Sequence, residues 1–313
     1  MAIIGNEAIL QVICCPYHYD SGLRDVNNND MNIFECSECG RSFHFRDGVL
    51  VLMPDIEDNM ESLLATKEQE VRDSQVDRYS LWFGEYTNQL EYEAITDSLC
   101  LDSNDILVDL GCGIGRYTLK FAQQVSTVIA VDHSLQSLLY LKKQMEKMNV
   151  SNIILVQADI SHLPLKSSIC TKAVSSQVLT FLPGNAMRER SAHDAHRVLT
   201  SKGVAVFTVF NYHIYRVIKR LLGVQGVFSR EGLHHELGFY YYNFGRNELA
   251  GLLSRNGFII DSARGICNFP REKVMHMQRK IIKKLVHRID RIVEFTPLSY
   301  MMGDLLIAIA QKS

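Results

Sequence analysis

Long apolar runs and strong net charge are both missing from this sequence. No stretch approaches the roughly 20 consecutive apolar residues that a membrane-spanning helix requires. Residues 1–7 also lack the basic start and the sustained apolar stretch of a signal peptide. The formal net charge is only −2 over 313 residues, so the whole molecule has no strong electrostatic attraction to nucleic acid or anionic lipid, although local patches remain compatible with it. We therefore expect a cytoplasmic protein with no membrane span and leave its oligomeric state open.

A disulfide framework is not expected either. Eight cysteines in a chain without a secretory signal favour free thiols or metal ligands. The sequence shows no internal repeat and no low-complexity tract. What is present is the composition of a folded protein, with 47% hydrophobic and 22% charged residues, which suffices for one large domain and a small one.

The most informative segment is residues 106–116, an apolar run followed by a glycine-rich turn. The run Ile106 to Val108 suits a buried parallel strand. Gly111, Gly113 and Gly115 allow a tight turn and a close approach of the backbone to a ligand, where a Cβ atom would clash. A strand, such a turn and a helix that starts near Arg116 are typical of a nucleotide-binding α/β unit, although glycine-rich turns also occur as plain connections.

Acidic residues follow the next two apolar runs. Asp132 ends the first of them, where a carboxylate can accept hydrogen bonds from both ribose hydroxyls of a nucleoside. Asp159 follows the second, where it could accept from an adenine amine while Ile160 packs on the ring. Each acid taken alone is as readily a helix N-cap or a turn former. Their order on consecutive strand ends favours a nucleoside site.

At this point the chain resembles the class I S-adenosylmethionine-dependent methyltransferases. The residues that carry the likeness are Val108-Asp109-Leu110-Gly111-Cys112-Gly113-Ile114-Gly115, then Val131-Asp132, then Ala158-Asp159-Ile160. The resemblance implies that Asp109 lies near the amino group of the cofactor, that the glycine turn faces its methionine portion, and that Asp132 takes the ribose. The cofactor-binding residues expected on this basis are Tyr79, Asp109, Gly111, Cys112, Gly113, Gly115, Asp132, His133, Asp159, Ile160 and Gln177.

The dinucleotide-binding dehydrogenases are the nearest alternative, and their fingerprint differs. They require a third glycine where Arg116 stands, and they rarely place an acid at the Asp109 position. The resemblance therefore implies an α/β fold with a Rossmann-like, seven-stranded methyltransferase sheet. Its fourth strand and the loop after it are expected at residues 173–179, and its later strands at 204–209, 258–260 and 305–310, the last of them antiparallel at the sheet edge. A helix is expected at 117–124, and a helix and turn at 196–203.

Four residues near the N-terminus have the spacing of metal ligands. Cys15 and His18 form a C-x₂-H pair, Cys36 and Cys39 form a C-x₂-C pair, and seventeen residues separate the two pairs. This spacing predicts a structural zinc ribbon in which one histidine replaces a cysteine. Cys14 is an alternative ligand in a C-x₃-H pairing, and a degenerate ribbon without metal is the other possibility. Residues 43–54 predict a hairpin that turns at Asp47-Gly48.

Three parts follow from these patterns: a zinc-ribbon-like module at 1–55, a helical linker and aromatic lid at 56–100, and a methyltransferase domain at 101–313. Helical sequence is expected at 61–73. In related methyltransferases an aromatic segment before the first strand covers the cofactor, and Tyr79 and Tyr86 suit that role better than Trp82 and Phe83, because their hydroxyls need polar partners. Insertions near 211–238 and 271–292 are expected to cap the substrate site. The second is rich in Lys and Arg, which would suit RNA, an anionic substrate or a membrane surface, or simply a solvated face.

The methyl acceptor is expected to be a small molecule or an RNA base. A ribbon followed by a class I domain resembles the guanine-N1 methyltransferases of ribosomal RNA in order of parts, and many small-molecule enzymes as well. The loop at 175–177 lacks the Asn/Asp-Pro-Pro-Tyr/Phe motif of enzymes that methylate adenine amines, and no Pro-Cys pair suits pyrimidine C5 chemistry. No general base is assigned, since His213, His234 and His235 are each more often structural. The alternative function is a non-catalytic protein of methyltransferase fold that binds the cofactor as a partner or regulator.

Overall fold

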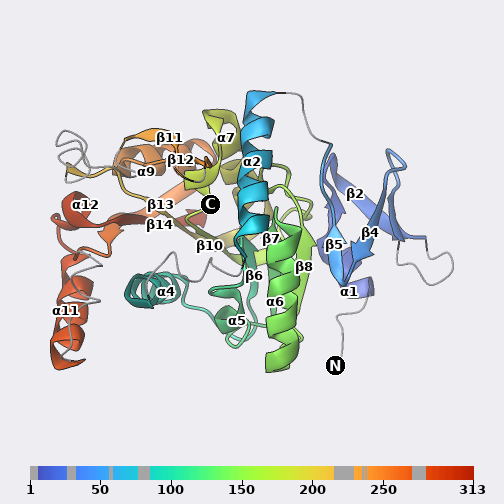
Figure 1. The fold of residues 1–313 in the computed structure, drawn as a ribbon. Coiled ribbons are helices and arrows are strands. Elements are labelled where there is room, and N and C mark those ends of the chain that lie inside the picture. The colour runs from blue at the N-terminus through green and yellow to red at the C-terminus, as the bar shows by residue number, and fades with distance from the viewer. Residues whose placement is uncertain are drawn as a thin grey trace.

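The computed structural model of the chain describes residues 6–26, 33–55, 59–76, 85–214, 229–234, 236, 238–269 and 280–313. Among these residues twelve strands form one sheet, in the order β1-β2-β3-β4-β5-β8-β7-β6-β9-β10-β14-β13. Figure 1 shows this sheet running through the molecule from the N-terminal strands to the C-terminal region. A separate pair, β11 (Glu231–Leu233) and β12 (Tyr240–Tyr242), lies outside it.

Seven strands of this sheet form the Rossmann-like core that the sequence predicts. They are β6 (Ile106–Leu110), β7 (Thr127–Asp132), β8 (Ile153–Gln157), β9 (Cys170–Ser176), β10 (Leu199–Phe210), β13 (Phe258–Ile266) and β14 (Leu305–Lys312). The first five pair in parallel, whereas β14 is antiparallel to both of its neighbours. Side chains on both faces of β7 and β8 are buried, as expected for parallel strands covered on both sides.

One detail of the predicted topology is wrong. The last strand, β14, lies between β10 and β13, and β13 is the edge strand. The burial of the two strands agrees with this order, because Leu306 to Ala308 of β14 are fully covered while Ile259 of β13 is exposed. A continuous apolar run such as Leu305 to Ala310 is typical of a strand whose two faces are both covered, as in the interior of a sheet.

Helices cover the two faces of the core sheet (Figure 1). One face buries side chains of α4 (Glu85–Leu99), α5 (Thr118–Phe121) and α6 (Leu135–Met148). The other buries side chains of α1 (Asn6–Val12), α7 (Gly184–Val198) and α9 (Arg246–Arg255). The remaining helices in the described part of the chain are α2 (Met60–Ser74), α11 (Lys280–Val293), α12 (Ser299–Met302) and the short 3₁₀ turns η1 (Ile160–His162) and η2 (Leu179–Phe181).

One predicted helix is shorter than expected, since the helix expected at 117–124 is only Thr118–Phe121. The helix expected before strand five ends at Val198. Residues 199–203 form an irregular start of β10, where the pairing with β9 shifts register between Leu199 and Val204. Lys202 takes a positive φ of 64° within this irregularity.

Helix α6 shows how local sequence places an element beside the glycine turn. The hydroxyl of Ser134 accepts from Ser137 N at 3.0 Å and caps the first turn. Leu138, Leu141 and Met145 then recur at helical spacing and are buried. Asn149 ends the helix in the left-handed conformation, with φ at 53°.

The N-terminal strands are β1 (Cys14–Cys15), β2 (His18–Asp25), β3 (Ile33–Cys36), β4 (Ser42–Arg46) and β5 (Val49–Val51). The hairpin between β4 and β5 turns at Asp47-Gly48, as predicted. β5 then pairs in parallel with β8, Leu50 opposite Val156, so the ribbon extends the core sheet. Leu23, Phe34 and Phe43 belong to the same buried cluster as the core strands. The sequence did not indicate this junction.

Candidate functional site

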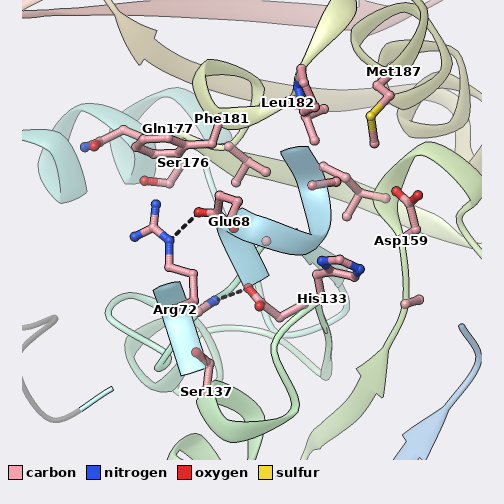
Figure 2. Close-up of a pocket in the computed structure, with 18 residues that line it drawn as sticks. Glu68, Arg72, His133, Ser137, Asp159, Ser176, Gln177, Phe181, Leu182 and Met187 are labelled. Atoms are coloured by element: carbon pink, nitrogen blue, oxygen red, sulfur yellow. Dashed lines mark hydrogen bonds and ion pairs between the residues drawn. The ribbon is translucent and has the colours of Figure 1, made fainter. Parts of the chain in front are cut away.

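A cavity of about 100 Å³ opens at the carboxyl ends of the core strands (Figure 2). This edge of a parallel sheet is where open α/β folds bind their ligands. Eighteen residues line it: Ala65, Glu68, Arg72, Gly111, Gly113, Asp132, His133, Ser137, Ala158, Asp159, Ile160, Ser176, Gln177, Val178, Phe181, Leu182, Pro183 and Met187. Seven of the eleven residues predicted to bind a cofactor are among them.

The glycine turn forms the floor of this cavity. Gly111 has a φ of 72°, and a Cβ atom placed there would lie 2.4 Å from Val178 Cγ2, so only glycine fits. Gly113, with a φ of 55°, also lines the cavity. Gly115 does not line it. A Cβ atom on Gly115 would lie 2.3 Å from Leu141 Cδ1, so this glycine allows α6 to pack closely behind the turn.

Asp132 presents its carboxylate at the cavity wall. One oxygen accepts from Gly113 N at 2.6 Å and the other from Ser134 N at 2.9 Å. Burial raises the pKa of this carboxyl, and the two backbone N–H groups partly offset the rise. Next to it, the backbone carbonyl of His133 accepts from Gln157 Nε2 at 3.1 Å. The acid is thereby held in one orientation between the turn and the start of α6.

Asp159 caps a turn and also lines the cavity. Its side chain caps η1 by accepting from Ser161 N at 2.7 Å, and it lies 3.6 Å from His162 Nδ1. Burial opposes ionisation, but the contacts with His162 and Ser161 outweigh it and lower the pKa of the carboxyl. The same residue lines the cavity together with Ile160. Capping therefore does not exclude a contact with a ligand.

Asp109, Cys112 and Gly115 are not among the lining residues, although all three were predicted to bind a cofactor. Asp109 is buried at the end of β6 and accepts from Thr118 Oγ1 at 2.7 Å. Burial raises the pKa of this carboxyl to about 7. A neighbouring cation would lower that pKa, so the proton on Asp109 would respond to a positively charged ligand group.

A buried carboxylate, Glu91 of α4, organises the loop after β9. It is fully buried, and it accepts from Gln177 Nε2 at 2.7 Å and from Ser176 Oγ at 2.9 Å. Arg116 Nη2 lies 3.2 Å from Glu91 and 2.9 Å from Ser176 Oγ. The residue that replaces the third glycine of a dehydrogenase motif thus anchors the loop that carries Gln177. No sequence motif indicates Glu91, because it lies within a helix and next to neither a glycine turn nor the end of a strand.

Helix α2 and η2 supply the walls that the sequence did not predict. Glu68 and Arg72 face the cavity from α2 and form an ion pair, and the Arg72 guanidinium lies 4.6 Å from the centroid of the Phe181 ring (Figure 2). Phe181, Leu182 and Met187 form an apolar wall on the other side. The only sequence signal was a charged pair at helical i, i+4 spacing, which usually indicates a solvated face.

Several other predicted residues lie away from the cavity. Tyr86 is not among the lining residues, and its buried side chain donates to Asp290 Oδ2 at 3.2 Å. His213 is buried with its ring 3.5 Å from Asp304, and His234 stacks on Phe239. Predictions for Tyr79, Trp82, Phe83 and His235 lie outside the described residues, as do residues 215–228 and 271–279 of the two insertions.

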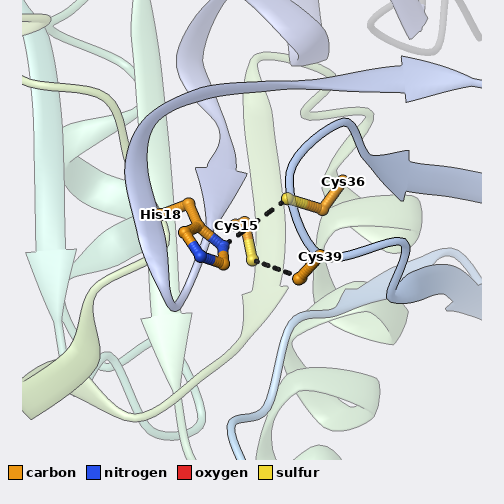
Figure 3. A group of neighbouring side chains, drawn as sticks. All are labelled: Cys15, His18, Cys36 and Cys39. Atoms are coloured by element: carbon orange, nitrogen blue, oxygen red, sulfur yellow. Dashed lines mark hydrogen bonds between the residues drawn. The ribbon is translucent and has the colours of Figure 1, made fainter.

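The four predicted metal ligands meet in the ribbon (Figure 3). Their ligand atoms all lie within 4.8 Å of one another. Cys15 Sγ is 3.9 Å from Cys39 Sγ, and Cys36 Sγ is 3.7 Å from His18 Nδ1. Ligand atoms on a tetrahedron about 2.3 Å from zinc are about 3.8 Å apart, so this arrangement fits the ion. Cys14 is buried and does not belong to the cluster.

Comparison with known proteins agrees with this geometry. Residues 108–207 match a family model described as a methyltransferase domain. A stretch of 113 residues is 37% identical to an uncharacterized chloroplastic methyltransferase of Arabidopsis thaliana, over 34% of this chain and 31% of that protein. Another of 122 residues is 30% identical to carboxy-S-adenosyl-L-methionine synthase of Dichelobacter nodosus, over 38% of this chain and 50% of that protein. The chain thus spans half or less of the length of these curated relatives.

The fold also has solved counterparts. One is 1,6-didemethyltoxoflavin-N1-methyltransferase of Burkholderia thailandensis, solved with 1,6-didemethyltoxoflavin and S-adenosylhomocysteine bound. It aligns with a TM-score of 0.56 and 17% identity, over 88% of this chain and 97% of its own. A likeness at this identity concerns the fold alone. Residues 108–207 therefore match a methyltransferase domain, and the chain has the fold of the class I methyltransferases.

Proposed function

We propose that this protein is an S-adenosylmethionine-dependent methyltransferase that acts on a small molecule. The observation that carries the proposal is the convergence of four strand ends on one cavity. The glycine turn, Asp132, Asp159 with Ile160, and Gln177 all line that cavity. They come from β6, β7, β8 and β9 in order, which is the order that the class I pattern requires.

The residues at the cavity fit the proposed cofactor. Gly111 and Gly113 line the part of the cavity that would take its methionine portion, and Asp132 offers carboxylate oxygens to its ribose hydroxyls. Asp159 offers an acceptor beside the apolar side chain of Ile160, as an adenine ring needs. The sulfonium of S-adenosylmethionine, when bound, supplies an activated methyl group. Because it is already a good leaving group, the protein mainly has to align an acceptor atom about 3 Å from the methyl and exclude water.

The rest of the wall suits a small acceptor. Phe181, Leu182 and Met187 are apolar, and α2 covers the opening from the other side. Arg72 is the one arginine on the wall, and no lysine is among the described lining residues. An RNA substrate would call for several cations along the entrance. The structure from Burkholderia thailandensis was solved with 1,6-didemethyltoxoflavin bound, which also favours a small-molecule acceptor.

We further propose that the ribbon binds one structural zinc ion through Cys15, His18, Cys36 and Cys39. Four protein ligands complete a tetrahedral shell and leave no open position for a catalytic water. The ion would therefore stabilise the ribbon and take no part in methyl transfer.

A methyl-transfer assay tests the proposed activity. The protein is incubated with S-adenosylmethionine labelled in its methyl group, first with a small-molecule extract and then with total RNA. Label transferred to the extract is the expected result, and label in RNA alone would replace the small-molecule acceptor by an RNA base. If neither is labelled while S-adenosylhomocysteine still binds by calorimetry, the non-catalytic alternative is favoured. Absence of both binding and transfer would contradict the proposal altogether.

A further inference from the structure

Helix α11 and the residues after it carry a row of exposed apolar side chains. Ile281 is 83% exposed, Leu285 56%, Ile292 67% and Phe295 70%, with Ile289 between them at 40%. These five residues are called here the outer strip. The four isoleucine and leucine residues recur at three- and four-residue intervals and so share one side of the helix, and Phe295 follows in the turn after its end. Single exposed apolar side chains are ordinary on protein surfaces, but a continuous row of large ones marks an interaction site.

The opposite side of α11 is held firmly against the body of the protein. Asp290 is buried and accepts from Tyr86 OH at 3.2 Å and from Asn268 N at 2.8 Å. His287 Nε2 lies 2.8 Å from Glu93 Oε2, and Arg291 pairs with Asp97. Since these contacts fix the rotation of the helix, the outer strip cannot turn inward. Figure 1 shows α11 at the end of the molecule opposite the ribbon.

Basic side chains border the outer strip. Lys284 and Arg288 are exposed and lie one helical turn apart along one flank of the strip. Neither has an ion pair with any carboxylate in the described part of the chain, whereas Arg291, on the inward side, is paired. The outward surface of α11 therefore combines an apolar stripe with a cationic edge.

We infer that α11 docks on the surface of an anionic lipid bilayer and lies in the plane of the interface. The outer strip would enter the boundary between headgroups and acyl chains, while Lys284 and Arg288 extend to the lipid phosphates. Charge complementarity selects this occupant. RNA phosphates would pair with the basic edge but leave five apolar side chains in water. A second copy of the chain would cover the strip but bring two cationic edges together. No helix among the described residues is long and apolar enough to cross a membrane, so the contact is with the surface only.

Vesicle flotation tests the inference with the full-length chain. Vesicles of phosphatidylcholine alone are compared with vesicles of phosphatidylcholine and phosphatidylglycerol at three to one. The protein should float with the mixed vesicles only, and less at high salt. The double variant Ile281→Gln, Leu285→Gln should lower the partition coefficient about tenfold or more, because two aliphatic side chains no longer enter the interface. Lys284→Glu with Arg288→Glu should cause a loss of similar size.

Matched controls change the same chemistry elsewhere on the surface. Ile259→Gln alters an exposed aliphatic residue of the edge strand β13, and Lys143→Glu with Lys147→Glu reverses two exposed charges of α6. Both should float as the wild type does, and circular dichroism confirms that every variant is folded.

Failure of the wild type to float with mixed vesicles overturns the inference. The inference is also overturned if flotation is lost in Lys284→Glu with Arg288→Glu but kept in Ile281→Gln, Leu285→Gln. That result would indicate electrostatic adsorption to the vesicle surface without insertion of the outer strip. A dimer that Ile281→Gln, Leu285→Gln makes monomeric, without flotation, would assign the outer strip to a second copy, and RNA retention that depends only on Lys284 and Arg288 would assign the edge to RNA.

Discussion

Asp132 is the residue that we propose to bind the ribose of the cofactor. Its oxygens are oriented by Gly113 N and Ser134 N, and it stands on the cavity wall. We predict that Asp132→Asn weakens S-adenosylhomocysteine binding about 10- to 100-fold, because a charged hydrogen-bond acceptor to the ribose is lost. Isothermal titration measures the effect. Asp261→Asn, an exposed position on β13, serves as the control and should bind normally; equal affinity of the two variants would contradict the assignment.

The raised pKa of Asp109 predicts how the stability of the protein depends on pH. Its pKa is raised from the ordinary 3.8 to about 7, so the folded state keeps a proton that the unfolded chain loses from about pH 4 upward. This residue therefore makes the wild type progressively less stable as the pH rises from about 4 to about 7, after which its effect is constant. Asp109→Asn removes this contribution.

The prediction for Asp109 is tested by comparing the two proteins at several pH values. The free energy of unfolding of Asp109→Asn, minus that of the wild type, should increase between pH 4 and pH 7 and then level off. Taking the difference cancels the other groups that titrate in the same range. Urea unfolding at pH 5, 6 and 8 provides the measurement, and a difference that does not vary with pH would show that Asp109 is ionised throughout.

At the scale of elements, the turn after β6 depends on glycine for two separate reasons. Gly111 has a φ of 72°, and its added Cβ atom would meet Val178 Cγ2 at 2.4 Å. We predict that Gly111→Ala lowers the melting temperature and abolishes S-adenosylhomocysteine binding, since the left-handed backbone alone costs about 1–2 kcal/mol for alanine. Adding Val178→Ala removes the clash but not the backbone strain, so it should restore only part of the stability.

Gly22 of β2 is the matched control for this prediction. A Cβ atom there would meet nothing within 4 Å, and its φ lies outside the left-handed range. Differential scanning fluorimetry with and without S-adenosylhomocysteine compares the variants. Gly22→Ala should keep the ligand-induced rise in melting temperature. If Gly111→Ala also keeps it, the turn does not contact the ligand.

The elements differ in how far local sequence determined them. The strands at 106–110, 127–132 and 153–157 and the hairpin at Asp47-Gly48 follow from local apolar runs and turn residues, so they were predictable. The edge position of β13 and the cover that α2 forms over the cavity depend on which surfaces meet after folding. No local sequence pattern indicates which surfaces meet. The edge strand was therefore predicted wrongly, and the cover formed by α2 was not predicted.

At the scale of the whole molecule, the ribbon and the methyltransferase core share one sheet and one buried cluster. We therefore predict one zinc ion per chain and a single thermal transition whose midpoint falls when Cys36 and Cys39 are both replaced by serine. The loss should reach the core because β5 pairs directly with β8. Elemental analysis and calorimetry measure the two quantities.

Cys100→Ser is the control for the zinc prediction, since this thiol is exposed and outside the ribbon. It should retain the metal and the wild-type transition. Metal-free protein that melts at the wild-type temperature would show that the cluster is an apo hairpin, and two separate transitions would show that the ribbon unfolds independently of the core.

The sequence by itself determined the class of fold and the positions of the glycine turn, the acids and the four candidate metal ligands. These features depend on backbone conformation, burial periodicity and ligand spacing, and short segments of the sequence determine all three. Only the tertiary structure decided that Glu91 holds the loop of Gln177, that α2 and η2 complete the cavity, and that the ribbon continues the core sheet. Glu91 and Gln177 are 86 residues apart, and such pairings follow from the packing of whole elements, which local patterns do not encode.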